Sequence, residues 1–247
     1  MPRWIEGTVV DNIHWTDTLY SVRVRADIQP FTAGQFARLG LHIGERRLGR
    51  PYSFVNSPHE DIHEFYSVIV PEGPLSPRLA QLQAGDSVLV GPRSAGFFTL
   101  SIVPDAPTLW MLSTGTALGP FLSMLKTDEP WQRFARMVFV HAVRHAEELT
   151  YQEQIHALLQ RNPQQLQYIP FVSREATDFA LPGRIPAAIE SGALQRRAGL
   201  DMTPADSQIM ICGNPAMVRD TQALLETLGF VRNTRKIDGH ITTENYW

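Results

Sequence analysis

The stretch TLWMLSTGTALGPFLSML, residues 108 to 125, contains the pattern that decides the fold of the second half of the chain. Its apolar start, 108–112, predicts a buried strand, and the segment 119–126 predicts a helix. A loop of glycine, serine and threonine between them brings free backbone N–H groups to the positive end of the helix dipole. This arrangement suits a bound phosphate, although any tight turn between a strand and a helix favours glycine and threonine as well.

The same alternation of strands and helices continues toward the C-terminus. Further strands are predicted at 136–143, 167–173 and 207–213, and further helices at 149–160, 185–194 and 216–229. Alternation of this kind predicts a parallel sheet covered by helices. A second loop, CGNPAMVRD at 212–220, follows the last of these strands, with Asn214 placed to cap the next helix and Pro215 to open it. Two such loops at the carboxyl ends of parallel strands would flank one ligand crevice.

Residues 1 to about 100 show a different pattern, in which short strands alternate with turn residues. The predicted strands are 7–13, 18–26, 35–41, 46–55, 64–70 and 86–92. Six strands at this spacing predict a small antiparallel barrel or sandwich. One helix interrupts them at 76–83, with Ser76 as N-cap, Pro77 at the first helical position and Gly85 beyond its end. We expect the two patterns to be connected at 103–107.

Composition restricts the class of protein. The 247 residues suffice for one large domain or two ordinary ones, and the net charge of −3 gives no bulk attraction to nucleic acid or to a membrane. One cysteine cannot form an internal disulfide and favours a reducing cytoplasm. The chain has no apolar stretch of about 18 residues and no signal-like N-terminus. We therefore expect a cytoplasmic protein without a metal site, whose partners include neither nucleic acid nor a membrane.

A second informative stretch, RPYSFVNSP at residues 50 to 58, lies in the fourth predicted strand. Arg50, Tyr52 and Phe54 alternate, so they share one face of an extended segment. A cation and an aromatic ring on one face suit a ligand with an anionic part and a flat aromatic part. An edge strand with a solvated Arg50 beside a packed Tyr52 fits the same pattern.

Three arginines closely follow predicted strands of the second half, namely Arg144, Arg174 and Arg184. Taken singly, each fits a solvated surface residue. Clustered at one edge of the sheet, they would match a phosphate monoester, because guanidinium forks fit phosphate geometry. Such a cluster favours NADP over NAD, whose ribose is usually held by an acidic residue.

Taken in order, these motifs make the chain resemble the bacterial ferredoxin/flavodoxin–NADP⁺ reductases. The motifs are RPYS (50–53), EGPLSPRL (72–79), STGTALGP (113–120), HAVR (141–144), VSRE (172–175), CGNPAMV (212–218) and ENYW (244–247). The resemblance covers almost the whole length of the chain. It implies an FAD-binding antiparallel β-barrel at 1–103 and an NADP-binding α/β domain at 104–247, whose C-terminal aromatic tail packs on FAD.

The resemblance implies roles for the N-terminal motifs. Arg50 would hold the flavin pyrophosphate, Tyr52 would pack on the isoalloxazine, and Ser53 would lie near flavin N5 as a catalytic group. The helix that begins near Leu75 and Ser76 would direct its N-terminus at the pyrophosphate, while Ser76 can also serve as a plain N-cap. The residues expected to line the flavin are Phe54, Val55, Phe65, Tyr66, Ser67 and Val68.

The resemblance also implies a binding site for NADP(H). Its residues are Thr114, Gly115, Thr116, Arg144, Arg174, Arg184 and Asn214. The loop residues would approach the pyrophosphate and the nicotinamide, and the arginines would bind the 2′-phosphate. Cys212 would lie beside the nicotinamide as a catalytic residue, although a small packing residue at a buried strand end fits equally.

The C-terminal ENYW is unusual, because chain ends are commonly polar. The resemblance implies that Tyr246 covers the flavin ring on its nicotinamide side and that Trp247 stacks on the FAD adenine. Simple packing of both rings on the barrel is the alternative. Glu244 is a candidate catalytic group for proton transfer.

The implied function is FAD-dependent transfer of electrons between NADPH, which delivers a hydride, and a one-electron carrier, ferredoxin or flavodoxin. We expect a monomer that meets this acidic carrier with basic residues. The candidates are Arg46, Arg47, Arg50, Arg78 and Arg93. Two alternatives are a reductase component of an oxygenase, without a fused iron–sulfur domain because the chain has one cysteine, and a non-catalytic flavin- or nucleotide-binding regulator. The joint presence of Ser53, Cys212 and the arginines disfavours the regulator.

Overall fold

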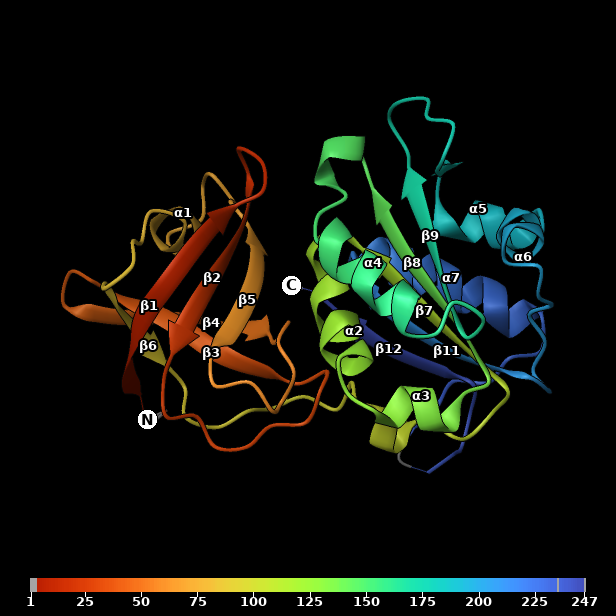
Figure 1. The fold of residues 1–247 in the computed structure, drawn as a ribbon, viewed down its shortest axis with the longest axis horizontal. Helices are drawn as coiled ribbons and strands as arrows, with labels where there is room; N and C mark the ends of the chain where they lie inside the picture. The colour runs from red at the N-terminus through yellow and green to blue at the C-terminus, as the bar shows by residue number, and fades with distance from the viewer. Residues whose placement is uncertain (1–3, 235, 247) are drawn as a thin grey trace. The chain divides into compact units, whose positions relative to one another are not determined.

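The computed structural model describes residues 4–234 and 236–246, and their contacts divide the chain into two compact units. The N-terminal unit comprises residues 1–99 and 119–127, and the C-terminal unit comprises residues 100–118 and 128–247. Each unit is built on its own six-stranded sheet, which Figure 1 colours from red to yellow in the first unit and from green to blue in the second.

The N-terminal unit is an antiparallel barrel. Its strands are β1 (Ile5–His14), β2 (Leu19–Arg25), β3 (Phe36–Ile43), β4 (Arg46–Ser53), β5 (His63–Val68) and β6 (Ser87–Val90). They run in the order β4-β3-β6-β1-β2-β5, which confirms all six predicted strands and their antiparallel pairing. The outer strands β4 and β5 are joined just beyond Ser53 by a bridge between Phe54 and Phe65, and Val55 N donates to Glu64 O at 2.9 Å. This bridge closes the sheet into a barrel.

Aromatic rings fill the centre of the barrel. Phe54 stacks on Phe31 with ring centroids 3.8 Å apart and lies 5.2 Å from Phe65. Val22 and Val24 of β2 alternate with more exposed residues and point to the same core, as the period of a half-buried strand requires. Closure of the barrel therefore depends on the residues that directly follow the RPYS motif.

The helix predicted at 76–83 is shorter than expected. Helix α1 spans Ser76–Leu79, Leu75 occupies the N-cap, and Pro77 is the second helical residue. The predicted N-cap role of Ser76 is wrong, because its Oγ accepts the backbone N–H of Val70 at 2.9 Å instead of capping the helix. The helix ends early because Asn12 Nδ2 donates to the carbonyl of its last residue and to carbonyls just after it. The acceptors are the oxygens of Leu79, Ala80 and Leu82 at 3.0, 3.1 and 2.8 Å.

Helix α2 (Leu118–Leu125) packs with the barrel, although it follows a strand of the second sheet in sequence. Ser123 Oγ donates to Asn56 O at 2.7 Å, and Lys126 Nζ donates to Val55 O at 3.1 Å. The ring of Phe121 meets that of Phe98 edge-on at 5.4 Å. The two units defined by contacts therefore exchange segments at three points in the sequence. The sequence analysis instead placed a single boundary between residues 103 and 104.

The C-terminal unit contains a parallel sheet. Its strands are β7 (Thr108–Thr114), β8 (Arg136–Val143), β9 (Leu166–Val172), β10 (Leu181–Pro182), β11 (Ser207–Gly213) and β12 (Ile241–Asn245). Their order is β10-β9-β8-β7-β11-β12, and the four predicted strands are confirmed. The edge strands β10 and β12 were not predicted. The signal for β12 was the β-branched run at 241–243, which the reading of ENYW as a tail overlooked.

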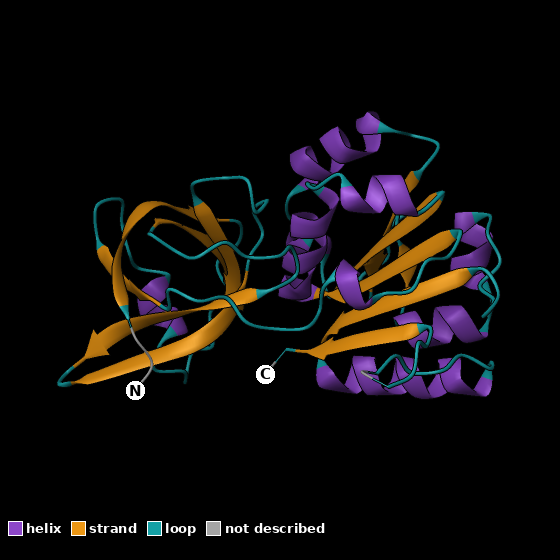
Figure 2. Cartoon of the chain, turned by 90° about the horizontal axis from the view of Figure 1, so that it is seen from below, coloured by secondary structure: helices purple, strands orange, loops and turns teal. Residues whose placement is uncertain are grey.

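Helices cover both faces of this sheet (Figure 2). They are α3 (Glu129–Arg133), α4 (Gln152–Arg161), α5 (Ile185–Glu190), α6 (Ala193–Ala198) and α7 (Pro215–Thr227). Helices α5, α6 and α7 pack on the face that holds Trp110 and Val138, and α4 lies on the opposite face (Figure 1). The single helix predicted at 185–194 is wrong, because Gly192 at φ 73° separates α5 from α6.

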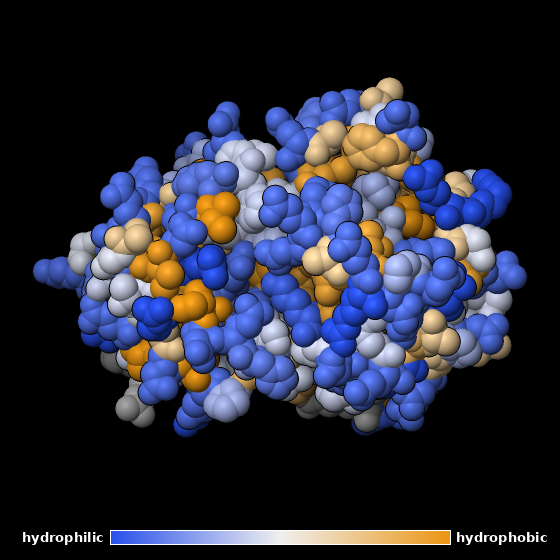
Figure 3. Space-filling view, in the orientation of Figure 1, coloured by the Kyte–Doolittle hydropathy of each residue, from blue (hydrophilic) through white to orange (hydrophobic). Residues whose placement is uncertain are grey.

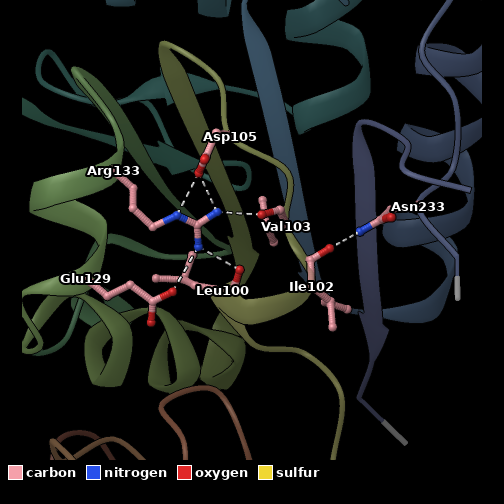
Figure 4. A network of polar contacts seen from close by, with 7 residues as sticks. All are labelled: Leu100, Ile102, Val103, Asp105, Glu129, Arg133 and Asn233. Atoms are coloured by element: carbon pink, nitrogen blue, oxygen red, sulfur yellow. Dashed lines mark hydrogen bonds and ion pairs between the residues drawn. The ribbon is translucent and has the colours of Figure 1, made fainter.

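The segment expected to connect the two patterns is fixed by one arginine (Figure 4). Arg133 Nη1 donates to Leu100 O at 2.8 Å, and Nη2 donates to Val103 O at 2.5 Å. Its Nε donates to Asp105 at 2.9 Å, and Glu129 accepts a second bond from Nη1 at 2.9 Å. Residues 100–105 are thus an ordered part of the C-terminal unit rather than a free linker.

The surface carries few large apolar side chains. Hydrophilic residues cover most of the face drawn in Figure 3, and apolar residues show there in separate areas. The most exposed large apolar side chain among the described residues is Phe97, at 66%. In the described part of the chain, no helix is both long and apolar enough to cross a membrane.

Candidate functional site

The two glycine-containing loops of the C-terminal unit meet where the strand order of the sheet reverses. From β7 the chain adds β8, β9 and β10 on one side and then returns to place β11 and β12 on the other. Asn214 N, just after β11, donates to Thr114 Oγ1, at the end of β7, over 2.9 Å. Ligands of open α/β sheets bind at this kind of switch point. The structure thus brings together the two loops that the sequence placed beside one ligand.

Gly213 makes this close approach of the loops feasible. Its φ is 139°, and a Cβ built on it would lie 2.1 Å from Thr114 Oγ1. A side chain here would therefore displace the hydroxyl that accepts the N–H of Asn214. Asn214 in turn caps α7, because its side chain accepts from Ala216 N at 2.9 Å and from Met217 N at 3.3 Å. The predicted cap, with Pro215 in the first turn, is confirmed.

A buried histidine, His141, contacts the backbone of the loop after β7. Gly115, at φ 55°, begins a short 3₁₀ turn, η2 (Gly115–Ala117), and its carbonyl lies 3.2 Å from His141 Nε2. Burial lowers the pKa of His141 to about 4, so the neutral ring donates Nε2–H to this carbonyl. Thr116 in the same turn is buried. His141 belongs to the HAVR motif, and a polar residue inside an apolar strand was the signal that could have found it.

Cys212 and Glu244 are neighbours in the sheet, paired in register between β11 and β12. Burial raises the pKa of the Cys212 thiol well above its ordinary value, and the nearby Glu244 adds to the effect. Burial also raises the pKa of Glu244 to about 7, and its Oε2 has no hydrogen-bond partner among the described residues. The site thus holds a thiol that stays protonated and a carboxyl that can exchange a proton near neutral pH.

The chain end continues from this pair toward the loops. Tyr246 N donates to Gly213 O at 3.0 Å, so the residue after β12 lies against the end of β11. Trp247 lies outside the described residues. Tyr246 is therefore tied to the loop junction through its backbone.

Arg144, Arg174 and Arg184 follow three strands that are neighbours in the sheet, β8, β9 and β10. Arg174 N donates to Arg144 O at 2.9 Å, which joins the first two loops directly. All three residues are exposed. The ion pairs found among the described residues involve other arginines, so these guanidinium groups face solvent without a carboxylate partner. The sequence analysis predicted that these three arginines follow strands whose ends lie at one edge of the sheet, and the strand order agrees with this.

In the barrel, closure places the RPYS strand beside β5. Arg50 is exposed, and its Nη1 donates only to the carbonyl of Gly49 at 3.2 Å among the described residues. Tyr52 is half-buried, and Ser53 is 8% exposed. Burial raises the pKa of Tyr52 to about 12, while a hydrogen bond with Ser67 of β5 and the charge of Arg50 oppose the shift. The Tyr52 side chain therefore lies close to both the Arg50 guanidinium and the Ser67 hydroxyl.

The residues expected to line a flavin differ in their exposure. Phe54, Val55 and Phe65 are almost completely buried in the barrel. Tyr66 and Ser67 keep slight exposure, and Val68 keeps more. Leu75 and Ser76 are buried at the start of α1, where the Tyr20 hydroxyl donates to Ser76 O at 3.0 Å. The more open side chains of this region are those of Arg50, Tyr52 and Val68.

Comparison with known proteins gives the family. A model of the oxidoreductase NAD-binding domain matches residues 111–223. A flavodoxin/ferredoxin–NADP reductase of Escherichia coli (strain K12) is 50% identical over 248 residues, and the match covers 100% of both chains. This chain belongs to the flavodoxin/ferredoxin–NADP reductases. A ferredoxin–NADP reductase of Pseudomonas aeruginosa is 36% identical over 225 residues, which cover 87% of this chain and 86% of that protein.

The fold of the reductase family is also seen in a solved relative. The crystal structure of a ferredoxin NADP⁺ reductase from Neisseria gonorrhoeae, with bound FAD and NADP, matches this chain with a TM-score of 0.94. The two chains are 33% identical, and the match covers 99% of each. An antiparallel barrel followed by a parallel sheet with helices is thus the architecture of this oxidoreductase family, as the resemblance implied.

Proposed function

We propose that this chain is an FAD-dependent reductase that passes electrons between NADPH and a one-electron carrier, ferredoxin or flavodoxin. The observation that supports the proposal most strongly is the junction of Thr114 with Asn214 at the switch point of the sheet, with three arginines on the neighbouring strand ends. A dinucleotide needs backbone donors for its pyrophosphate and cations for a 2′-phosphate, and this arrangement offers both.

The donor set of the C-terminal unit fits NADP(H). The Thr114 hydroxyl accepts the N–H of Asn214, so its own proton remains free to donate to a ligand oxygen. A Cβ built on Gly115 would meet no atom within 4 Å, which leaves room for a ligand to approach the backbone there. We assign the pyrophosphate and nicotinamide to Thr114, Gly115, Thr116 and Asn214. We assign the 2′-phosphate to Arg144, Arg174 and Arg184.

The donor set of the barrel fits FAD. The exposed guanidinium of Arg50 would bind the pyrophosphate, and the half-buried ring of Tyr52 would pack on the isoalloxazine. Ser53 would place its hydroxyl at the flavin as a catalytic group. The backbone of 54–55 and the strand β5 would form the wall, and the start of α1 at Leu75 and Ser76 would contact the pyrophosphate. Bound FAD would supply the conversion between hydride transfer and single-electron transfer.

The residues at the ends of β11 and β12 complete the proposed site. Cys212 would present a neutral thiol beside the nicotinamide, since burial keeps it protonated. Glu244 would hold or release a proton at its carboxyl oxygen near neutral pH. Tyr246 would cover the flavin on its nicotinamide side, and we assign Trp247, outside the described residues, to the FAD adenine.

The carrier protein would meet the barrel through its arginines. Arg46, Arg47, Arg50, Arg78 and Arg93 are all exposed. Opposite charges on the two proteins would steer their encounter, and Arg50 would be shared with the cofactor. The single cysteine supports a reducing, cytoplasmic location, and we propose that the protein acts as a monomer.

The test is the visible absorption spectrum of the purified protein before and after anaerobic addition of NADPH. Flavin bands that bleach establish the cofactor, the nucleotide and the hydride step together. Flavin bands that persist would instead indicate a regulator. A spectrum without flavin bands, even after addition of FAD, would contradict the assignment of Arg50 and Tyr52. Reduction of a purified ferredoxin or flavodoxin then distinguishes a carrier reductase from an oxygenase component.

A further inference from the structure

Two carboxylates bind the backbone of the loop that carries Arg144. Glu148 Oε2 accepts the N–H of Arg144 at 2.8 Å and that of His145 at 3.1 Å. Glu175, which directly follows Arg174, accepts the N–H of Ala146 from the neighbouring strand end. Three consecutive backbone donors, at 144–146, are thus bound by acidic side chains, one of which comes from the Arg174 loop.

These bonds belong to a larger connection between the ends of β8 and β9. Besides the bond from Arg174 N to Arg144 O, Ser173 donates to Val143 O twice, from its backbone N and from Oγ, each at 3.1 Å. A small apolar cluster lies beneath the two loops. Its members are Val143, Val172 and Ala180, with Ala146 and Leu149 packed against them. The two arginine loops are therefore built as one unit.

The two carboxylates also leave the positive charges of Arg144 and Arg174 without an ion-pair partner among the described residues. An acidic side chain close to an arginine ordinarily pairs with the guanidinium and occupies its donors. Glu148 and Glu175 bind backbone N–H groups instead, and the ion pairs of the described chain include neither of them. The forks of Arg144 and Arg174 remain available to an external anion.

We propose that Glu148 and Glu175 are positioning residues that determine coenzyme preference, by holding the 144–146 backbone so that Arg144 and Arg174 converge on the 2′-phosphate. The inference rests on the proposed use of NADP(H). It goes beyond that function because it assigns selectivity to two acidic residues, whose charge alone would repel a phosphate. They act through the arginines.

The experiment titrates the FAD-containing protein with adenosine 2′,5′-bisphosphate and, separately, with 5′-AMP. We expect Glu175→Ala to weaken the bisphosphate about fivefold and to leave 5′-AMP within about twofold, the size of effect that one charge-assisted hydrogen bond at an exposed position gives. Glu175→Gln should stay near wild type, because the amide oxygen still accepts the N–H of Ala146. Glu147→Ala is the matched control, because Glu147 is exposed in the same loop and its replacement removes the same charge.

Steady-state kinetics supply a second readout. Glu175→Ala should raise KM for NADPH by a similar factor while kcat, KM for NADH and flavin absorbance stay unchanged. Equal effects of Glu147→Ala and Glu175→Ala would overturn the proposal, as would tighter binding of the bisphosphate by Glu175→Ala. Equal weakening of 5′-AMP would overturn it too. A wild-type protein that binds both nucleotides equally contradicts the use of NADP(H) itself, whereas a wild-type preference that Glu175→Ala leaves intact contradicts only this inference.

Discussion

Replacement of Gly213 by alanine tests whether the two loops form one site. The new Cβ would lie 2.1 Å from Thr114 Oγ1 and 3.1 Å from Thr114 N, at a backbone φ of 139°. The hydroxyl must turn away, and the hydrogen bond from Asn214 N is then lost. A backbone strained in this way costs about 1–3 kcal/mol and the lost bond about 1 kcal/mol, so the sum is about 2–4 kcal/mol.

The backbone strain and the lost hydrogen bond are detected by different measurements. Strain in a central strand should lower the midpoint of thermal unfolding, and loss of the Thr114–Asn214 bond should raise the Kd for NADP⁺. The size expected for the rise in Kd is about tenfold. Gly199→Ala is the control for backbone strain alone, because Gly199 has φ 62° and a Cβ there meets nothing within 4 Å. It should lower the midpoint without changing the Kd.

A double-mutant cycle isolates the clash between the two loops. Thr114→Ala removes the hydroxyl that the new Cβ meets, so Gly213→Ala should cost less in that background than in the wild type. Strictly additive effects of Gly213→Ala and Thr114→Ala on the Kd for NADP⁺ would refute the reasoning, because they would mean that the two loops act independently.

Three further predictions concern the proton site, the segment at 100–105 and the chain end. Burial raises the pKa of Glu244 from 4.5 to about 7, so the folded protein binds more protons than the unfolded chain in that range. Stability should therefore fall as pH rises from about 4.5 to 7. Glu244→Gln should flatten this slope when thermal unfolding is followed against pH. Arg133→Ala, which leaves the carbonyls of Leu100 and Val103 without their donor, should lower the free energy of unfolding by about 3 kcal/mol in urea titrations, and Arg133→Lys should recover part of the loss. Deletion of Tyr246 and Trp247 should raise the Kd for FAD and change KM for NADPH, and unchanged values of both would contradict the cover assigned to these rings.

Regular periodicity made most of the fold predictable. The apolar runs at 108–112, 136–143 and 207–213 became β7, β8 and β11 with little change in their bounds. What failed were features set by single contacts. Helix α1 ends at Leu79 because the amide of Asn12, distant in sequence, binds the carbonyls of Leu79 and Ala80. No pattern within 76–83 could have indicated that partner.

The candidate site was predictable to the level of loops, but not to the level of individual contacts. Strand ends of a parallel sheet lie at one edge, so Arg144 and Arg174 could be placed together from the sequence. The sequence analysis gave no role to their acidic neighbours Glu148 and Glu175, because nothing in the sequence shows that these carboxylates bind backbone N–H groups of the 144–146 loop. His141 was overlooked although it is a polar residue inside an apolar strand, because nothing in the sequence shows that its ring binds the carbonyl of Gly115.

Helix α2 shows how far contacts can depart from sequence order. Its residues directly follow the loop at 113–116, so periodicity alone groups them with the second sheet. Gly119 nevertheless packs near Val55, and Ser123 and Lys126 bind the carbonyls of Asn56 and Val55. The polypeptide that leaves the proposed nucleotide loop is therefore anchored, within a few residues, on the segment that follows Ser53 of the RPYS motif. A substitution such as Ser123→Ala would leave the buried carbonyl of Asn56 without this donor, so its effect should appear in flavin binding as well as in stability.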